Sequence, residues 1–163
     1  MRVNELPQDA LNALQTLVDN GVVDVNSPEV QNSMFYQRIQ NQLILTFTAG
    51  IDPALLLFMT QIVATSPSLG WVTMSGYNLG EHGPATAAAL AASNTIQKIN
   101  IRSNQLGEHG PATEAVFADR NNAAQALINE LLETNREHDL FPDDLMNLIG
   151  EYVMPLQHIE LLI

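Results

Sequence analysis

Cysteine is absent from this sequence of 163 residues. Its absence excludes disulfide bonds, thiolate metal sites and cysteine nucleophiles. Basic residues are scarce, because 6 Lys and Arg stand against 18 Asp and Glu and give a net charge of −12. Nucleic-acid binding depends on clustered cationic side chains, so this composition argues against a nucleic-acid partner. An anionic membrane surface is disfavoured for the same reason.

Long apolar runs are missing as well. The longest, Pro53–Met59, is too short to cross a bilayer, and the polar, acidic start of the chain has no apolar signal-peptide core. The hydrophobic share of 46% is nevertheless enough for a packed core, which predicts one compact domain. We therefore expect a soluble, cytoplasmic protein that binds neither nucleic acid nor membrane.

The clearest positive feature is a tandem repeat in the middle of the chain. An identical octapeptide, Leu-Gly-Glu-His-Gly-Pro-Ala-Thr, occupies Leu79–Thr86 and Leu106–Thr113. Alternating apolar residues precede each copy and indicate short strands, whereas the Gly-Pro pairs indicate helix starts. Steps of 27 align two sets of apolar residues, which are Leu45, Val72 and Ile99 in one set and Phe47, Met74 and Ile101 in the other. The middle of the chain is thus predicted to run strand, loop, helix three times.

Helical segments are predicted on both sides of this array. Before it, we expect a helix that starts near Pro7 and stops at Asn20-Gly21, an edge strand at Val22–Val25, and a helix from Pro28 to about Gln40. The predicted apolar side of that second helix is formed by Val30, Met34, Phe35 and Ile39, and Leu43 is predicted to begin the alternation of the first strand.

After the array, the sequence Ala123–Leu132 is helical in pattern where a fourth strand would fall, so the array is predicted to stop. A last helix is predicted from Phe141, with Leu145, Leu148, Ile149 and Val153 on its apolar side, and terminal Ile159–Ile163 is expected to dock or pair. The predicted domains are residues 1–42 as a helical N-terminal cap, 43–122 as the repeat units and 123–163 as a helical C-terminal cap.

The third unit contains a known sequence pattern. It reads Ile96-x-x-Ile99-x-Ile101-x-x-Asn104-x-Leu106-Gly107, and the unit before it reads Leu69-x-x-Val72-x-Met74-x-x-Tyr77-x-Leu79-Gly80. This pattern and length resemble leucine-rich repeats of the ribonuclease-inhibitor class. Tyr77 replaces the expected asparagine, and the first unit keeps only the rhythm. The side chain of Asn104 is expected to satisfy backbone groups in the turn behind the strand, where no ladder bonds are available. The resemblance implies an α/β fold: a short leucine-rich-repeat-like solenoid of about three strand–helix units with helical N- and C-terminal caps.

A solenoid of this kind would bind another protein through the concave face of its strands. Outward strand positions would form that face, and Thr46 and Thr48 belong to it. The predicted partner-binding residues are Trp71, Thr73, Ser75, Lys98, Asn100 and Arg102. They combine the sole tryptophan with two basic residues, which suits an acidic patch on a partner protein. The alternative is an ordinary solvated strand face, and a homodimer also stays open. No catalytic residue, metal or cofactor is predicted.

Two other functions remain as alternatives. Glu81, His82, Glu108 and His109 recur in the octapeptides, and stacked loops could bring them together as a metal-dependent enzyme site. The alternative is that duplication copied polar loop residues that only face solvent and place charge at the helix N-termini. The enzyme signatures His-Glu-x-x-His and Gly-x-Ser-x-Gly are absent from the sequence.

The second alternative function rests on the stretch Leu140–Val153, which resembles the opening helix of an F-box. That resemblance implies a ubiquitin-ligase adaptor, although a plain amphipathic capping helix fits the same residues. Short acidic repeat chains are also similar in style to effectors that bacteria secrete into host cells. This likeness would change the expected location to the cytoplasm of a host cell.

Overall fold

The computed structural model describes residues 1–47, 50–138, 141–142 and 159–162 of a mixed α/β chain. Its α-helices are α1 (Gln8–Asp19), α2 (Pro28–Gln31), α3 (Met34–Ile39), α4 (Pro53–Ala64), α5 (Gly83–Ala91) and α6 (Gly110–His138). Its strands are β1 (Ile44–Thr46), β2 (Trp71–Thr73), β3 (Lys98–Asn100) and β4 (Glu160–Leu162). Three short 3-10 helices, η1 (Val3–Glu5), η2 (Gly80–His82) and η3 (Gly107–His109), complete the described elements.

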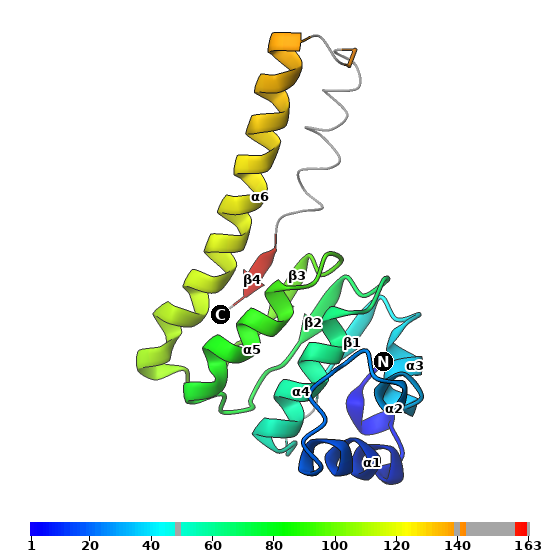
Figure 1. The fold of residues 1–163 in the computed structure, drawn as a ribbon. Helices are drawn as coiled ribbons and strands as arrows, with labels where there is room; N and C mark the ends of the chain where they lie inside the picture. The colour runs from blue at the N-terminus through cyan, green and yellow to red at the C-terminus, as the bar shows by residue number, and fades with distance from the viewer. Residues whose placement is uncertain (48–49, 139–140, 143–158, 163) are drawn as a thin grey trace.

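The four strands form one parallel sheet in the order β1-β2-β3-β4 (Figure 1). Leu45 pairs with Val72, and Val72 pairs with Ile99. The predicted repeat step is therefore the actual register of the first three strands. Parallel strands need a crossover between them, and α4 and α5 provide the crossovers of the first three strands.

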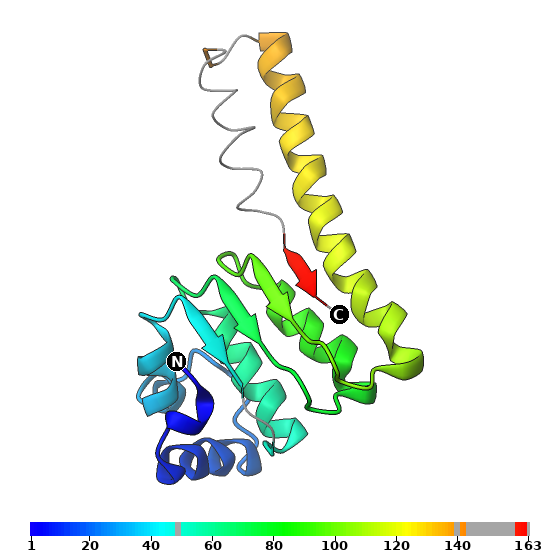
Figure 2. The ribbon, with the colours of Figure 1, turned by 180° about the vertical axis from the view of Figure 1, so that it is seen from behind.

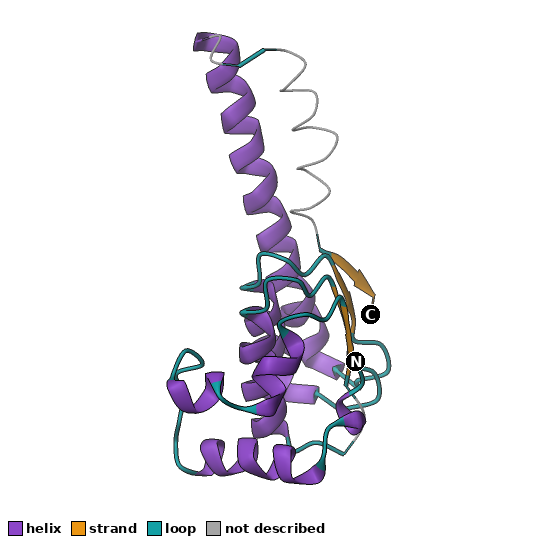
Figure 3. Cartoon of the chain, turned by 90° about the vertical axis from the view of Figure 1, so that its right-hand side faces the viewer, coloured by secondary structure: helices purple, strands orange, loops and turns teal. Residues whose placement is uncertain are grey.

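Helices cover one face of the sheet. Seen from the side, α4, α5 and α6 lie together behind the strands (Figure 3), and α5 contacts both of its neighbours. The side chains between these two layers form the core, and Leu45, Val72, Ile99 and Met74 are completely buried there. In the part of the chain that the structure describes, no helix covers the other face (Figure 2). We call this the open sheet face.

The sequence signals that start the helices act as predicted. Asp52 precedes Pro53, and its Oδ1 accepts hydrogen bonds from the N–H groups of Ala54 and Leu55 at 2.9 and 3.3 Å. These bonds satisfy two of the N–H groups that a helix start leaves without partners. The helices α5 and α6 begin at Gly83 and Gly110, immediately after the 3-10 turn of each octapeptide.

Asn104 holds two neighbouring units together. Its side-chain NH2 donates to the carbonyls of Met74 and Ile101, both at 2.5 Å, and its Oδ1 accepts from the N–H of Tyr77 at 2.8 Å. The side chain is 2% exposed. Buried backbone N–H and C=O groups beyond the end of a strand destabilise the fold when they have no hydrogen-bond partners. The side chain of Asn104 provides these partners. The predicted role of Asn104 is confirmed.

Three predictions for the N-terminal region are wrong. Val22–Val25 forms no strand: Val23 is 83% exposed, and Arg2 forms the bridge beside Thr46 at the edge of β1. The predicted helix from Pro28 is two helices, because Ser33 interrupts it and caps α3 by accepting from the N–H of Tyr36. Leu43 is 70% exposed and precedes β1 instead of opening its inward alternation.

The C-terminal region differs in two ways from the prediction. The domain boundary after Asn122 falls inside α6, which runs without a break from the third unit and extends beyond the rest of the body (Figure 1). The predicted last helix from Phe141, with its apolar residues Leu145, Leu148, Ile149 and Val153, lies mostly outside the described residues. The expectation that Ile159–Ile163 would dock or pair is confirmed for the part described, since β4 pairs with β3.

No helix among the described residues is long and apolar enough to cross a membrane.

Candidate functional site

The open sheet face begins with a row of four side chains at the N-terminal ends of the strands. Strand register places Ile44 beside Trp71, Trp71 beside Lys98 and Lys98 beside Glu160. Ile44 is 47% exposed and Trp71 is 37% exposed. These two large apolar side chains are exposed on neighbouring strands, so they mark the apolar part of the face.

Lys98 links the apolar part of this row to a charged part. Its Nζ lies 5.1 Å from the centre of the Trp71 ring, within range of a cation–π interaction. The same Nζ donates to both carboxylate oxygens of Glu160, at 2.9 and 2.8 Å. The prediction that Lys98 is a cation available to an acidic partner therefore needs correction, because Glu160 already pairs with that charge.

The next row is polar and uncharged at its centre. Thr46, Thr73 and Asn100 lie side by side in β1, β2 and β3, with Leu162 beside Asn100 in β4. Asn100 also accepts a hydrogen bond from the N–H of Arg102 at 3.1 Å. Ser75 and Arg102 are exposed beyond the ends of β2 and β3, whereas Thr48 lies outside the described residues. The structure thus brings together the six predicted partner-binding residues along two adjacent strands.

Three residues of this face were missed by the sequence analysis. Ile44 could have been found, because alternation about Leu45 turns it outward. Glu160 could not, because its place opposite Lys98 depends on a strand that returns from the far end of the chain. Arg2 forms a parallel bridge with Thr46, and no sequence signal links these two positions. With Arg2, the face carries three of the six basic residues of the chain.

Each octapeptide loop places a histidine near a glutamate. In each loop, the histidine approaches its own neighbour: His82 Nε2 is 3.8 Å from Glu81 Oε1, and His109 Nε2 is 3.8 Å from Glu108 Oε1. Within the described ranges, no three His, Asp or Glu side chains gather closely enough to hold a metal ion. The described residues thus give no support to the alternative in which the two Glu-His pairs form a metal site.

The two octapeptide loops pack against each other. The turns η2 and η3 contact each other, and Leu79 and Leu106 are buried beneath them. The F-box-like stretch Leu140–Val153, which carried the other alternative function, lies outside the described residues except for Phe141 and Pro142. Searches of protein-family models, curated proteins and solved structures found no match to this chain.

Proposed function

We propose that this chain is a short leucine-rich-repeat-like solenoid that binds a partner protein through the open sheet face. The observation that carries the proposal is the pair Ile44 and Trp71, which are neighbours in the strand register and lie exposed on a face that no described helix covers. Tryptophan is among the residues that contribute most to protein interfaces, because it buries a large area with few rotatable bonds.

Charge supports the same surface. The protein has a net charge of −12, yet Arg2, Lys98 and Arg102 all belong to this face. Because Lys98 is paired with Glu160, the cations that a partner would meet are Arg2 and Arg102. A partner that places an apolar side chain against Ile44 and Trp71 and a carboxylate near Arg102 would fit this arrangement.

Comparison of two variants tests the proposal. Trp71→Ala should reduce the capture of a specific partner from a cell extract about tenfold or more, as expected for loss of an aromatic hot spot. The matched control is Leu127→Ala, which removes a large apolar side chain that is 68% exposed on α6, away from the sheet. Capture is measured by mass spectrometry on immobilised wild type and variants. Both variants should keep the unfolding free energy of wild type within about 0.5 kcal/mol.

The proposal fails if Trp71→Ala captures the same proteins in the same amounts as wild type while remaining folded. It also fails if Leu127→Ala loses the partner and Trp71→Ala does not, because the contact would then lie on α6. Sedimentation at several concentrations distinguishes a second copy of the chain from a different protein as the partner.

A further inference from the structure

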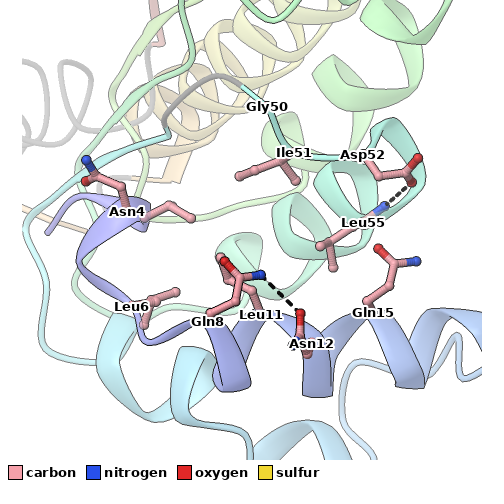
Figure 4. Close-up of a pocket in the computed structure, with 11 residues that line it drawn as sticks. Asn4, Leu6, Gln8, Leu11, Asn12, Gln15, Gly50, Ile51, Asp52 and Leu55 are labelled. Atoms are coloured by element: carbon pink, nitrogen blue, oxygen red, sulfur yellow. Dashed lines mark hydrogen bonds between the residues drawn. The ribbon is translucent and has the colours of Figure 1, made fainter.

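A cavity of about 440 Å³ lies between the N-terminal segment and the connection that leads from β1 to α4 (Figure 4). Its apolar lining comes from Val3, Leu6, Leu11, Ile51 and Leu55. Its polar lining comes from four carboxamides and one carboxylate, which are Asn4, Gln8, Asn12, Gln15 and Asp52. This volume lies in the range of small-molecule sites, which typically combine an apolar wall with a few polar groups.

The cavity arises from a difference between the first unit and the other two. Six residues connect β1 to α4, whereas nine connect β2 to α5 and nine connect β3 to α6. Among its described residues, the shorter connection has no counterpart of η2 and η3, whose turns pack over buried Leu79 and Leu106 in the later units. In the first unit, α1 and η1 lie against the connection instead, and Figure 4 shows the space that is left between them.

Two side chains of the cavity have an oxygen that can accept a hydrogen bond from a ligand. Gln15 donates its amide nitrogen to the Asp19 carboxylate at 2.9 Å, which leaves its oxygen to accept. Gln15 rises from α1 toward Asp52 and Leu55 across the cavity (Figure 4). One oxygen of Asp52 accepts from Ala54 and Leu55, and no bond to the other is found in the described part of the chain. Gln8 and Asn12 bond to each other at 3.0 Å.

The charge of the cavity favours a positively charged ligand. Asp52 is the only charged residue among its lining residues, and no Lys, Arg or His lines it. Asp52 already satisfies the helix start with one oxygen, so its second oxygen can accept from a ligand. A ligand that matches this lining is positively charged, donates several hydrogen bonds and carries a short aliphatic part for Leu6, Leu11 and Ile51.

We propose that this cavity binds a primary ammonium or guanidinium group on a short aliphatic chain. The head group donates to the Asp52 carboxylate and the Gln15 oxygen, and the aliphatic chain lies against the apolar wall. Such a group occurs both in free alkylamines and in the Lys or Arg side chain of another protein. The site is separate from the open sheet face, so it does not depend on the proposed function.

The test is a titration of the isotope-labelled protein with n-butylguanidinium at constant ionic strength, followed by amide resonances in NMR. We expect shifts at residues 3–15 and 50–55 with a dissociation constant on the order of 1 mM, as suits a small ligand. The neutral isostere n-butylurea should bind about fivefold or more weakly, because it lacks the charge. An acetylated and amidated Gly-Arg-Gly peptide that binds as well as n-butylguanidinium indicates a protein side chain as the source, and binding of the free cation alone indicates a small molecule.

Asp52→Asn is the decisive variant, because asparagine caps a helix as well as aspartate and removes only the charge. It should weaken n-butylguanidinium binding about fivefold or more while the unfolding midpoint is retained. Asp24→Asn is the matched control, since it removes one charge from an exposed loop outside the cavity and should leave binding unchanged. Equal binding of n-butylguanidinium and n-butylurea, equal binding by Asp52→Asn and wild type, or the absence of shifts at these residues overturns the proposal.

Discussion

Residues that are identical in the two octapeptides have different surroundings in the structure. A methyl group added to Gly83 would lie 2.7 Å from Leu106 Cδ2 and 2.7 Å from Thr113 Oγ1, both in the following unit. At Gly110, the nearest atom to such a group is 3.8 Å away, and it belongs to Leu106 of the same unit. The two glycines have similar backbone angles at a helix start, so only the packing between units separates them.

This difference gives a direct prediction. Gly83→Ala should lower the free energy of unfolding by about 1–3 kcal/mol, because the buried Thr113 and Leu106 must move to accept the added methyl group. Gly110→Ala should leave it unchanged or raise it by up to about 1 kcal/mol, because the added methyl group makes an ordinary van der Waals contact and alanine is favoured over glycine in helical backbone. Urea unfolding of both variants measures the difference. Equal effects would mean that the octapeptide loops of neighbouring units do not pack as described.

Predictions made from residue patterns had different outcomes at different positions. The pattern identified Asn104 as a partner for backbone groups of its own turn, and its bond to the Ile101 carbonyl confirms this. Its bonds to Met74 and Tyr77 depend on the register of the neighbouring strand. The spacing of Glu81, His82, Glu108 and His109 left open whether stacked loops would bring these side chains together. In the structure each histidine lies near its neighbouring glutamate, and no three such side chains gather to hold a metal ion among the described residues.

At the scale of elements, β4 is the strand that depends on contacts far apart in the sequence. It lies where the next repeat strand would fall, yet it follows α6 rather than a fourth repeat loop. Asn121 fixes its start by donating to the carbonyl of Ile159 at 3.1 Å and accepting from its N–H at 2.9 Å. Lys98 and Glu160 form the second link.

Hydrogen exchange can test how β4 is held. Asn121→Ala should raise the exchange rate of the Ile101 amide about tenfold, because that amide donates to the Leu162 carbonyl of β4 and opening becomes easier. The Phe47 amide, which donates to Thr73 at the opposite side of the sheet, should exchange as in wild type. Asn94→Ala is the matched control, as Asn94 is exposed and occupies the position equivalent to Asn121 in the preceding unit. A uniform rise at Phe47 and Ile101 would contradict a local role for Asn121.

The elements that sequence analysis predicted well are those whose signals are local and repeated. The first three strands and α4, α5 and the start of α6 follow from alternation, glycine-proline pairs and the constant repeat step. The predictions that failed concern segments whose structure depends on contacts between residues far apart in the sequence. Val22–Val25 has the composition of a strand, but Arg2 takes the position beside Thr46 at the sheet edge. The sequence analysis predicted the residues of the open sheet face that lie on its two central strands. It missed Arg2 and Glu160, which join the face at its two edges.

At the scale of the whole molecule, the two identical loops, the constant register of the first three strands and the helix that follows each of them support the proposed stack of units. Contacts run from each unit to the next, from α4 to α5 and from α5 to α6. In a stack of this kind, stability is a sum over units and the interfaces between them. We therefore expect the array to accept another unit at the point where its own sequence is duplicated.

The most direct test of stacking is to insert a second copy of residues 80–106 between Leu106 and Gly107. We expect one cooperative urea transition and protection of the insert from proteases. The slope of the unfolding free energy against urea concentration should rise by roughly a sixth, in line with the longer chain. A scrambled insert of the same composition is the control and should be cleaved. A separate transition or rapid cleavage of the duplicated unit would contradict the claim that this chain is built by stacking equivalent repeat units.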